Sequence, residues 1–204
     1  MIAMKKHIQN VMTRNAGKIY SINDFYDFKS DKKNTVKSAL YRLNNEGKIV
    51  RILDGLYVKL KYNKEAKEYI YPSAEDVAMK IADKYSWKVA PMGDLALNYS
   101  GLSSKVPDIW TYASDGPSRE YIYRGEKIIF KKTAMRIITK FSNELNLVIQ
   151  SIIALGKDNI TQADIEKLAQ LKPLIKENLK YDTSILPYWI KETIDKIAEV
   201  DYQE

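Results

Sequence analysis

The sequence predicts an α+β protein in which an N-terminal winged helix-turn-helix is followed by a mixed α/β domain that ends in a helical segment. Two observations predict this class. A basic helix leads directly into a two-stranded hairpin within residues 31–59, and the excess of positive charge lies in the same half of the chain. We expect domains of residues 1–62 and 63–204, the second with a small sheet over 88–132 and helices over 144–200.

The helix of the 31–59 segment is predicted from its apolar spacing. Val36, Leu40 and Leu43 stand at i, i+4 and i+7, which places them on one face of a helix. Ala39 borders that face and allows a neighbouring helix to approach closely. Gly47 is expected to end the helix, because glycine adopts the left-handed conformation that a helix C-terminus often needs.

The hairpin is predicted from the Asp54-Gly55 pair, which separates two largely apolar runs at residues 48–52 and 56–60. Both positions of such a turn tolerate positive φ, so this pair is a strong hairpin signal. Upstream we expect a helix over residues 3–14, a short strand over 17–20 and a second short helix capped by Ser21. The order helix, strand, helix, helix, strand, strand is typical of a winged helix.

The charge distribution separates this interpretation from its alternative, a helix and hairpin of some other α+β domain. Residues 1–70 contain 15 Lys and Arg against 7 Asp and Glu, whereas residues 71–204 contain 18 against 19. Residues 158–204 are acidic, with 6 basic against 10 acidic side chains. A basic domain beside a neutral one indicates a module that binds a polyanion, here double-stranded DNA.

Composition excludes several classes of site. The chain has no cysteine and a single histidine, His7, which rules out disulfides, thiolate metal sites and a histidine metal cage. No apolar run is long enough to cross a bilayer, and the N-terminus lacks an apolar signal core. We therefore expect a cytoplasmic protein with no cofactor, no bound metal and no membrane partner.

The remaining elements are predicted from caps, turns and periodicity. Residues 61–70 are expected to be a linker or a strand. The other expected elements are a helix opened by Ser73 and Asp76, an extended segment over 88–91, a short helix over 93–99, a strand over 109–113, a hairpin of 119–123 with 127–131, a helix over 145–153 closed by Gly156, a helix opened by Thr161 and Asp164, and a last helix with Pro187 at its first position.

The polar face of the basic helix supplies the candidate DNA-binding residues. Lys and Arg neutralise phosphates, and Asn and Arg can make paired contacts with base edges in the major groove. The candidates are Lys33, Asn34, Thr35, Lys37, Ser38, Tyr41 and Arg42 on the helix, with Arg51 beside the wing. The alternative is an ordinary solvated helix face, and Tyr41 could instead pack against the first helix.

Several strings of the sequence resemble one family of prokaryotic regulators. They are GKIYSINDF, the helix-hairpin segment, PSAEDVAMKIA, PMGDLALNYSGLSSKVP and YASDGPSREYIYRGEKIIF. Together they are similar to the AbiEi-like antitoxins of type IV toxin–antitoxin, or abortive-infection, systems. The resemblance covers most of residues 1–157, and its ALNYSGLSSKVP and SDGPSR strings are the most specific.

This resemblance implies an N-terminal winged helix that represses its own promoter, with inverted repeats as the expected binding site. It implies a second domain that opposes a nucleotidyltransferase-like toxin without forming a stable complex with it. Asp115, Ser118 and Arg119 are the candidate antitoxin or partner site. The alternative is a plain turn, in which Asp115 bonds its own backbone or pairs with Arg119.

Two further sets of residues have a structural interpretation. Asn98, Ser103, Ser104 and Lys105 lack the spacing of a serine hydrolase, and we expect a helix end with its loop. The fifteen tyrosines favour ordinary packing over stacking on single-stranded bases.

The leading prediction is a non-enzymatic transcriptional repressor and antitoxin. The alternatives are a nucleic-acid enzyme that a winged helix targets to DNA, and an adaptor that binds a protein through its C-terminal helices. Dimers and cooperative monomers are both compatible with the sequence.

Overall fold

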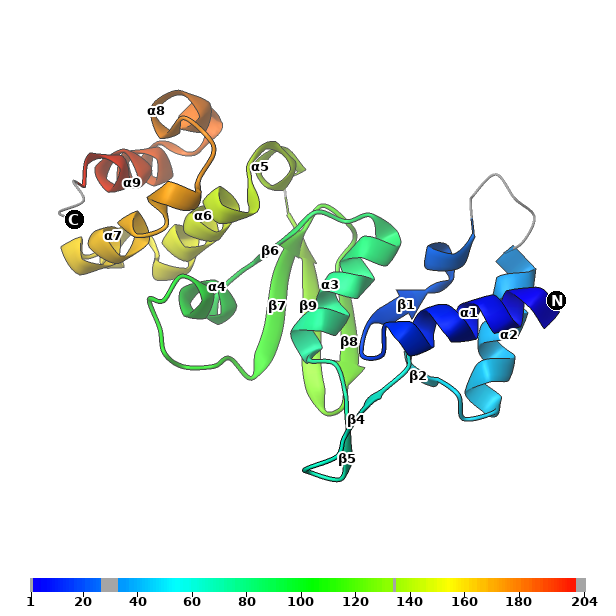
Figure 1. The fold of residues 1–204 in the computed structure, drawn as a ribbon. Helices are drawn as coiled ribbons and strands as arrows, with labels where there is room; N and C mark the ends of the chain where they lie inside the picture. The colour runs from blue at the N-terminus through cyan, green and yellow to red at the C-terminus, as the bar shows by residue number, and fades with distance from the viewer. Residues whose placement is uncertain (1, 27–32, 134, 201–204) are drawn as a thin grey trace. The chain divides into compact units, whose positions relative to one another are not determined.

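Figure 1 shows the computed structural model, which describes residues 2–26, 33–133 and 135–200. The chain divides into two compact units, Met1–Ser86 and Trp87–Glu204, and each contains both helices and strands. The α+β class is therefore confirmed. Residues 31 and 32, which open the helix-hairpin segment of the sequence, lie outside the described residues.

The N-terminal unit begins with the expected order of elements. These are α1 (Ile2–Arg14), β1 (Ile19–Ser21), a short 3-10 helix (Ile22–Phe25), α2 (Lys33–Asn45), β2 (Val50–Leu53) and β3 (Leu56–Val58). β3 lies between β1 and β2 and is antiparallel to both. Asp54 and Gly55 form the turn between β2 and β3, and the φ of +69° at Gly55 explains the glycine there.

The apolar face of α2 packs against α1, as its spacing predicts. Val36, Leu40 and Leu43 are completely buried, and Ile8 and Met12 of α1 belong to the same cluster. A helix with one fully buried face must turn the opposite face outward. The packing of α2 therefore determines which of its side chains reach solvent.

A hairpin follows β3 where the sequence predicted a linker or a single strand. Its strands, β4 (Lys61–Asn63) and β5 (Glu68–Ile70), pair in antiparallel register. The Asn63 side-chain oxygen accepts hydrogen bonds from the amides of Glu65 and Ala66 at 3.0 and 3.2 Å, which closes the turn. Such a short, exposed hairpin leaves little apolar periodicity in the sequence.

α3 (Ala74–Tyr85) starts at Ser73, whose hydroxyl accepts from the amide of Asp76 at 3.0 Å, as the capping pattern predicts. α3 packs on β1 and so belongs to the N-terminal unit. The compact unit thus extends further along the chain than the expected domain of residues 1–62.

A polar cross-link ties α3 to the short helix after β1. The Lys80 ammonium donates to Asp24 Oδ1 at 2.7 Å and to Asp83 Oδ2 at 2.6 Å. Burial alone would raise the pKa of Asp24, but hydrogen bonds from Lys80 and Ser21 outweigh it and hold that pKa below its ordinary value. Burial likewise tends to lower the pKa of Lys80, and its bonds to the two carboxylates raise it overall.

The C-terminal unit contains a four-stranded sheet in the order β6-β7-β9-β8. The strands are β6 (Val89–Pro91), β7 (Ile109–Ser114), β8 (Arg119–Tyr123) and β9 (Glu126–Lys132), and α4 (Asp94–Tyr99) lies between β6 and β7 in sequence. The β8–β9 hairpin was predicted. The parallel pairing of β7 with β9 was not predicted. β9 pairs with β8, its neighbour in sequence, on one side and with the earlier strand β7 on the other, and no local sequence signal indicates the second pairing.

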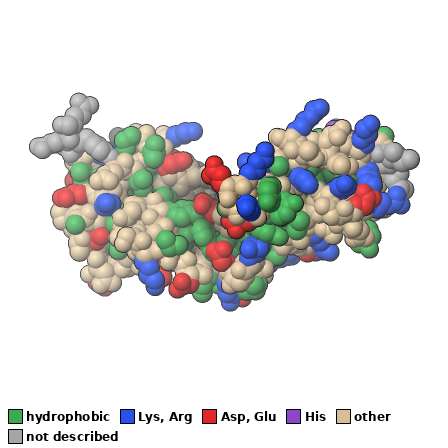
Figure 2. All heavy atoms as spheres, turned by 60° about the horizontal axis from the view of Figure 1, so that its bottom comes forward, with side chains coloured by type: hydrophobic (Ala, Val, Ile, Leu, Met, Phe, Trp, Pro, Cys, Tyr) green, Lys and Arg blue, Asp and Glu red, His purple; other side chains and the backbone are tan. Residues whose placement is uncertain are grey.

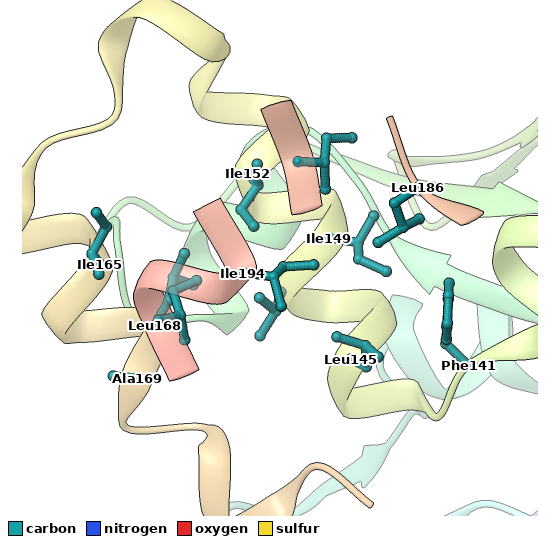
Figure 3. Close-up of a cluster of buried hydrophobic side chains, with 12 residues drawn as sticks. Phe141, Leu145, Ile149, Ile152, Ile165, Leu168, Ala169, Leu186 and Ile194 are labelled. Carbon is teal, nitrogen blue, oxygen red and sulfur yellow. The ribbon is translucent and has the colours of Figure 1, made fainter. Parts of the chain in front are cut away.

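Helices complete this unit: α5 (Met135–Lys140), α6 (Asn143–Leu155), α7 (Gln162–Ala169), α8 (Leu179–Asp182) and α9 (Tyr188–Glu199), with 3-10 turns at Lys157–Asn159, Lys172–Leu174 and Thr183–Ile185. Figure 3 shows the core between α6, α7 and α9, where Ile149, Leu168 and Ile194 are completely buried. Pro187 directly precedes α9 rather than occupying its first position. Among the described helices, none is both long and apolar enough to cross a membrane.

Replacing Asp24 with asparagine should destabilise the protein at neutral pH. The change removes the negative charge beside Lys80 and replaces Oδ2, which accepts from the amide and hydroxyl of Ser21, with an NH2 donor. Hydrogen bonds to charged groups contribute about 1.5–3 kcal/mol. Because the folded pKa of Asp24 is lowered, its contribution is fully present above its ordinary pKa, near pH 4, and is lost as pH falls through the folded value.

Urea unfolding of the wild type and Asp24→Asn between pH 3 and pH 7 measures this dependence. We expect the stability difference to shrink below about pH 4. Asp83→Asn is the control, since the Asp83 side chain is mostly exposed and should contribute less. A difference that stays constant over this range would contradict the role given to Asp24.

Candidate nucleic-acid interface

A groove of about 660 Å³ opens on the N-terminal unit, and α2 and the β2–β3 turn form most of its wall. Ile22 from the short helix, Tyr57 from β3 and Lys84 from α3 complete it. All of these elements belong to the N-terminal unit. The groove therefore combines three helical segments and a tight turn around one concave surface.

Seven of the eight candidate DNA-binding residues line this groove. They are Lys33, Asn34, Lys37, Ser38, Tyr41, Arg42 and Arg51. Thr35 is half-buried on α2 and is not part of the lining. The packing of Val36, Leu40 and Leu43 into the core explains the result, because it directs the opposite face of α2 into the groove.

The lining of the groove is strongly basic. Lys33, Lys37, Arg42 and Arg51 are joined by Lys84, and the acidic residue among the lining side chains is Asp54. In the part of the chain that the structure describes, Lys33, Lys37 and Arg42 form no ion pair. Their charges are therefore available to an anionic ligand.

The charge of the whole protein follows the same division. The N-terminal unit contains 17 Lys and Arg against 10 Asp and Glu, and the C-terminal unit contains 16 of each. The full net charge of +7 is thus carried by the unit that has the groove. Figure 2 shows basic side chains outnumbering acidic ones on the face of the N-terminal unit that it presents.

The β2–β3 turn is fastened to both neighbouring helices. The Arg51 amide donates to the side-chain oxygen of Asn44 at 2.8 Å, which ties β2 to the end of α2. The Lys84 ammonium donates to the Asp54 carbonyl at 2.9 Å, which ties the turn to α3. Sequence reasoning missed Lys84, because it lies 30 residues from the turn and in the segment assigned to the second domain.

The groove also contains an ion pair and an exposed aromatic ring. Arg51 forms an ion pair with the carboxylate of Asp54, whose side chain is 93% exposed. Tyr41 is 62% exposed and does not belong to the buried cluster between α1 and α2. Tyr41 instead offers an aromatic ring and a hydroxyl to a ligand in the groove.

The Asp115–Arg119 segment serves the sheet of the C-terminal unit. Asp115 Oδ1 accepts from the amide of Lys88 at 2.9 Å, and Lys88 is the residue directly before β6. Ser118 Oγ accepts from the amide of Lys132 at 2.9 Å. The exposed guanidinium of Arg119 lies 5.8 Å from the centre of the Trp87 ring.

Gly116 permits the close approach of the Trp87 ring. A Cβ built at Gly116 would lie 2.4 Å from the ring atoms Cε2 and Nε1 of Trp87, far inside van der Waals contact. The DGPS string therefore has a structural role: Asp115 and Ser118 form hydrogen bonds with other strands' ends, and Gly116 leaves room for the Trp87 ring. Of the three candidate residues here, Arg119 is the one whose charge faces solvent.

The remaining candidates have structural roles. The Asn98 side-chain amide donates to the carbonyls of Ser103 and Lys105 at 3.3 and 3.0 Å, which fastens the loop after α4 as expected. Ser104 and His7 are exposed. The described residues contain no group of three or more His, Cys, Asp or Glu side chains arranged to hold a metal ion.

Comparison with known proteins matches residues 6–180 to a protein family described as a family of unknown function, DUF6088. The match covers most of the chain and includes the groove of the N-terminal unit and the whole sheet of the C-terminal unit. No curated protein matches the chain.

Proposed function

We propose a function for this chain, which belongs to the family of unknown function DUF6088: it is a DNA-binding transcriptional repressor whose N-terminal unit is a winged helix-turn-helix. Its ligand is double-stranded DNA of its own promoter. By the resemblance to AbiEi-like proteins, it also acts as the antitoxin of a type IV toxin–antitoxin system.

The observation that carries the proposal is the groove, where five cations and one acid surround the polar face of α2. Lys and Arg side chains that neutralise phosphates release counterions, which provides affinity for any duplex. Asn34 and Arg42 can in addition form paired hydrogen bonds with adenine and guanine edges in the major groove. The groove therefore offers the two kinds of contact that sequence-specific DNA binding requires.

In the proposed complex α2 enters the major groove, and the β2–β3 turn lies against the adjacent backbone. Arg51 and Lys84 are placed on the turn side of the groove, where phosphates of that backbone would pass. A protein held in this way across a promoter blocks access of the polymerase. Winged helices commonly read inverted repeats as dimers, so two half-sites are expected.

The antitoxin part of the proposal concerns the C-terminal unit. That unit has no net charge, in contrast to the N-terminal one, and thus has no general attraction for DNA. Arg119 presents an exposed guanidinium at the start of β8. We assign it to the action against a nucleotidyltransferase-like toxin, in which no stable complex is required.

A Lys37→Ala/Arg42→Ala variant should bind a duplex of the upstream region on the order of tenfold or more weakly than the wild type, because two phosphate or base contacts are lost. The slope of log affinity against log salt should fall by about 0.9 for each phosphate contact removed. Fluorescence anisotropy between 50 and 200 mM salt measures both quantities.

The control is Lys157→Ala/Lys176→Ala, which removes the same charge from the exposed surface of the C-terminal unit. It should leave affinity and salt slope close to those of the wild type. Full-strength duplex binding by the Lys37/Arg42 variant would remove the groove from the interface.

Replacing Asp54 with asparagine should strengthen duplex binding. The change removes the acid of the groove and frees the Arg51 guanidinium from its ion pair. Exposed ion pairs contribute about 0.2–1 kcal/mol, which corresponds to a gain of about 1.4- to fivefold. The same anisotropy assay detects it, and a misfolded variant could not mimic a gain. Unchanged or weaker binding would show that phosphates do not approach the turn.

Arg119→Ala should abolish antitoxin action while leaving duplex binding unchanged. The substitution removes an exposed guanidinium and keeps the bonds of Asp115 and Ser118 that hold the sheet. The measurement is growth of cells that express the chain together with a nucleotidyltransferase-like toxin. Lys131→Ala, an exposed change on neighbouring β9, is the control and should still protect. Protection by Arg119→Ala at equal protein level would contradict this assignment.

A further inference from the structure

The β4–β5 hairpin presents two tyrosines on one face. Tyr62 and Tyr69 are directly opposite in the antiparallel register, and their ring centres lie 5.2 Å apart in an edge-to-face arrangement. They are 53% and 59% exposed, although aromatic side chains of this size are usually more deeply covered. Figure 1 shows the hairpin projecting from the strands of the N-terminal unit.

Contacts that do not involve the two tyrosine rings hold the hairpin at its base and at its tip. At its base the Gly17 amide donates to the Lys59 carbonyl at 2.7 Å, and Leu60 is buried. At its tip the Asn63 side chain closes the turn. The two tyrosines therefore form an ordered aromatic platform whose exposure the rest of the unit does not explain.

The hairpin carries three lysines against two glutamates. Lys64 and Lys67 lie in the connecting turn, and in the described part of the chain neither forms an ion pair. Glu65 and Glu68 are the acids of the hairpin, so its strands and turn keep a small positive charge.

A second basic concavity lies at the base of the hairpin. It has a volume of about 560 Å³, and Arg14, Lys18 and Lys61 contribute to its lining. The acid in that lining, Asp76, already accepts hydrogen bonds from the amide and hydroxyl of Ser73 at 3.1 and 2.8 Å. Basic side chains thus extend from the tip of the hairpin to its base.

We propose that the β4–β5 hairpin binds single-stranded nucleic acid, with bases stacked on Tyr62 and Tyr69 and phosphates at the neighbouring lysines. Stacking on an aromatic ring needs an exposed ring face and is tolerant of sequence, because every base has a π-face. Lysines beside the rings supply the electrostatic part of such binding. The residues of this site are separate from those of the α2 groove, so the inference does not depend on duplex binding.

A Tyr62→Ala/Tyr69→Ala variant of the full chain tests the proposal. The probes are fluorescein-labelled 20-mers of dT and of rU, which form no duplex and separate DNA from RNA as the source of the strand. At 50 mM salt we expect anisotropy to show binding by the wild type and an affinity loss of about tenfold or more in the variant. Tyr62→Phe/Tyr69→Phe retains the rings and should bind like the wild type.

Two controls keep this result distinct from the duplex proposal. Tyr188→Ala, an exposed tyrosine of the C-terminal unit, should change nothing, and Lys37→Ala/Arg42→Ala should keep binding to the 20-mers. Circular dichroism checks that the hairpin variants remain folded. Equal binding of the 20-mers by the double alanine variant and the wild type would overturn the proposal. So would binding by the wild type to vesicles with anionic lipids but to neither 20-mer.

Discussion

The burial of the apolar face of α2 is the constraint on which the N-terminal unit depends. Val36, Leu40 and Leu43 have no exposed surface, and full burial of such side chains stabilises the folded state by about 1.5–3 kcal/mol each. Rotating α2 about its axis would expose them and bury lysines. The rotation of α2, and with it the set of side chains in the groove, is therefore fixed by apolar packing and not by the polar residues themselves.

The β2–β3 turn gains its position from the same packing, through polar contacts at its two ends. The side-chain oxygen of Asn44, near the end of α2, accepts from the amide of Arg51. This bond fixes the position of the start of β2 relative to α2. Lys84 reaches the carbonyl of Asp54 from α3, and α3 is held on β1 with the help of the Lys80 cross-link. Lys84 thus holds the β2–β3 turn in place and also contributes positive charge to the groove. This double role explains why α3 belongs with the groove even though the sequence suggested a boundary before it.

Local signals of the sequence predicted much of this structure, and contacts between distant segments account for what they missed. The Ser73 and Thr161 caps, the Asp54-Gly55 turn and the Val36–Leu43 spacing depend on neighbours within a few residues, and each is present in the structure. The parallel pairing of β7 with β9 and the contribution of Lys84 depend on segments far apart in the chain. The candidate site was largely predictable because seven of its residues lie on or beside one helix, and helical spacing alone groups them.

Most of the residues in the ALNYSGLSSKVP and SDGPSR strings that have described contacts hold the C-terminal unit together. Asn98 fastens the loop of the ALNYSGLSSKVP string, and Asp115, Gly116 and Ser118 fasten or accommodate the strands around SDGPSR. These residues thus have structural roles within the C-terminal unit. The fold of the C-terminal unit therefore accounts for these residues without reference to any activity. Within SDGPSR, Arg119 has the exposed charged side chain, and its guanidinium also lies 5.8 Å from the centre of the Trp87 ring.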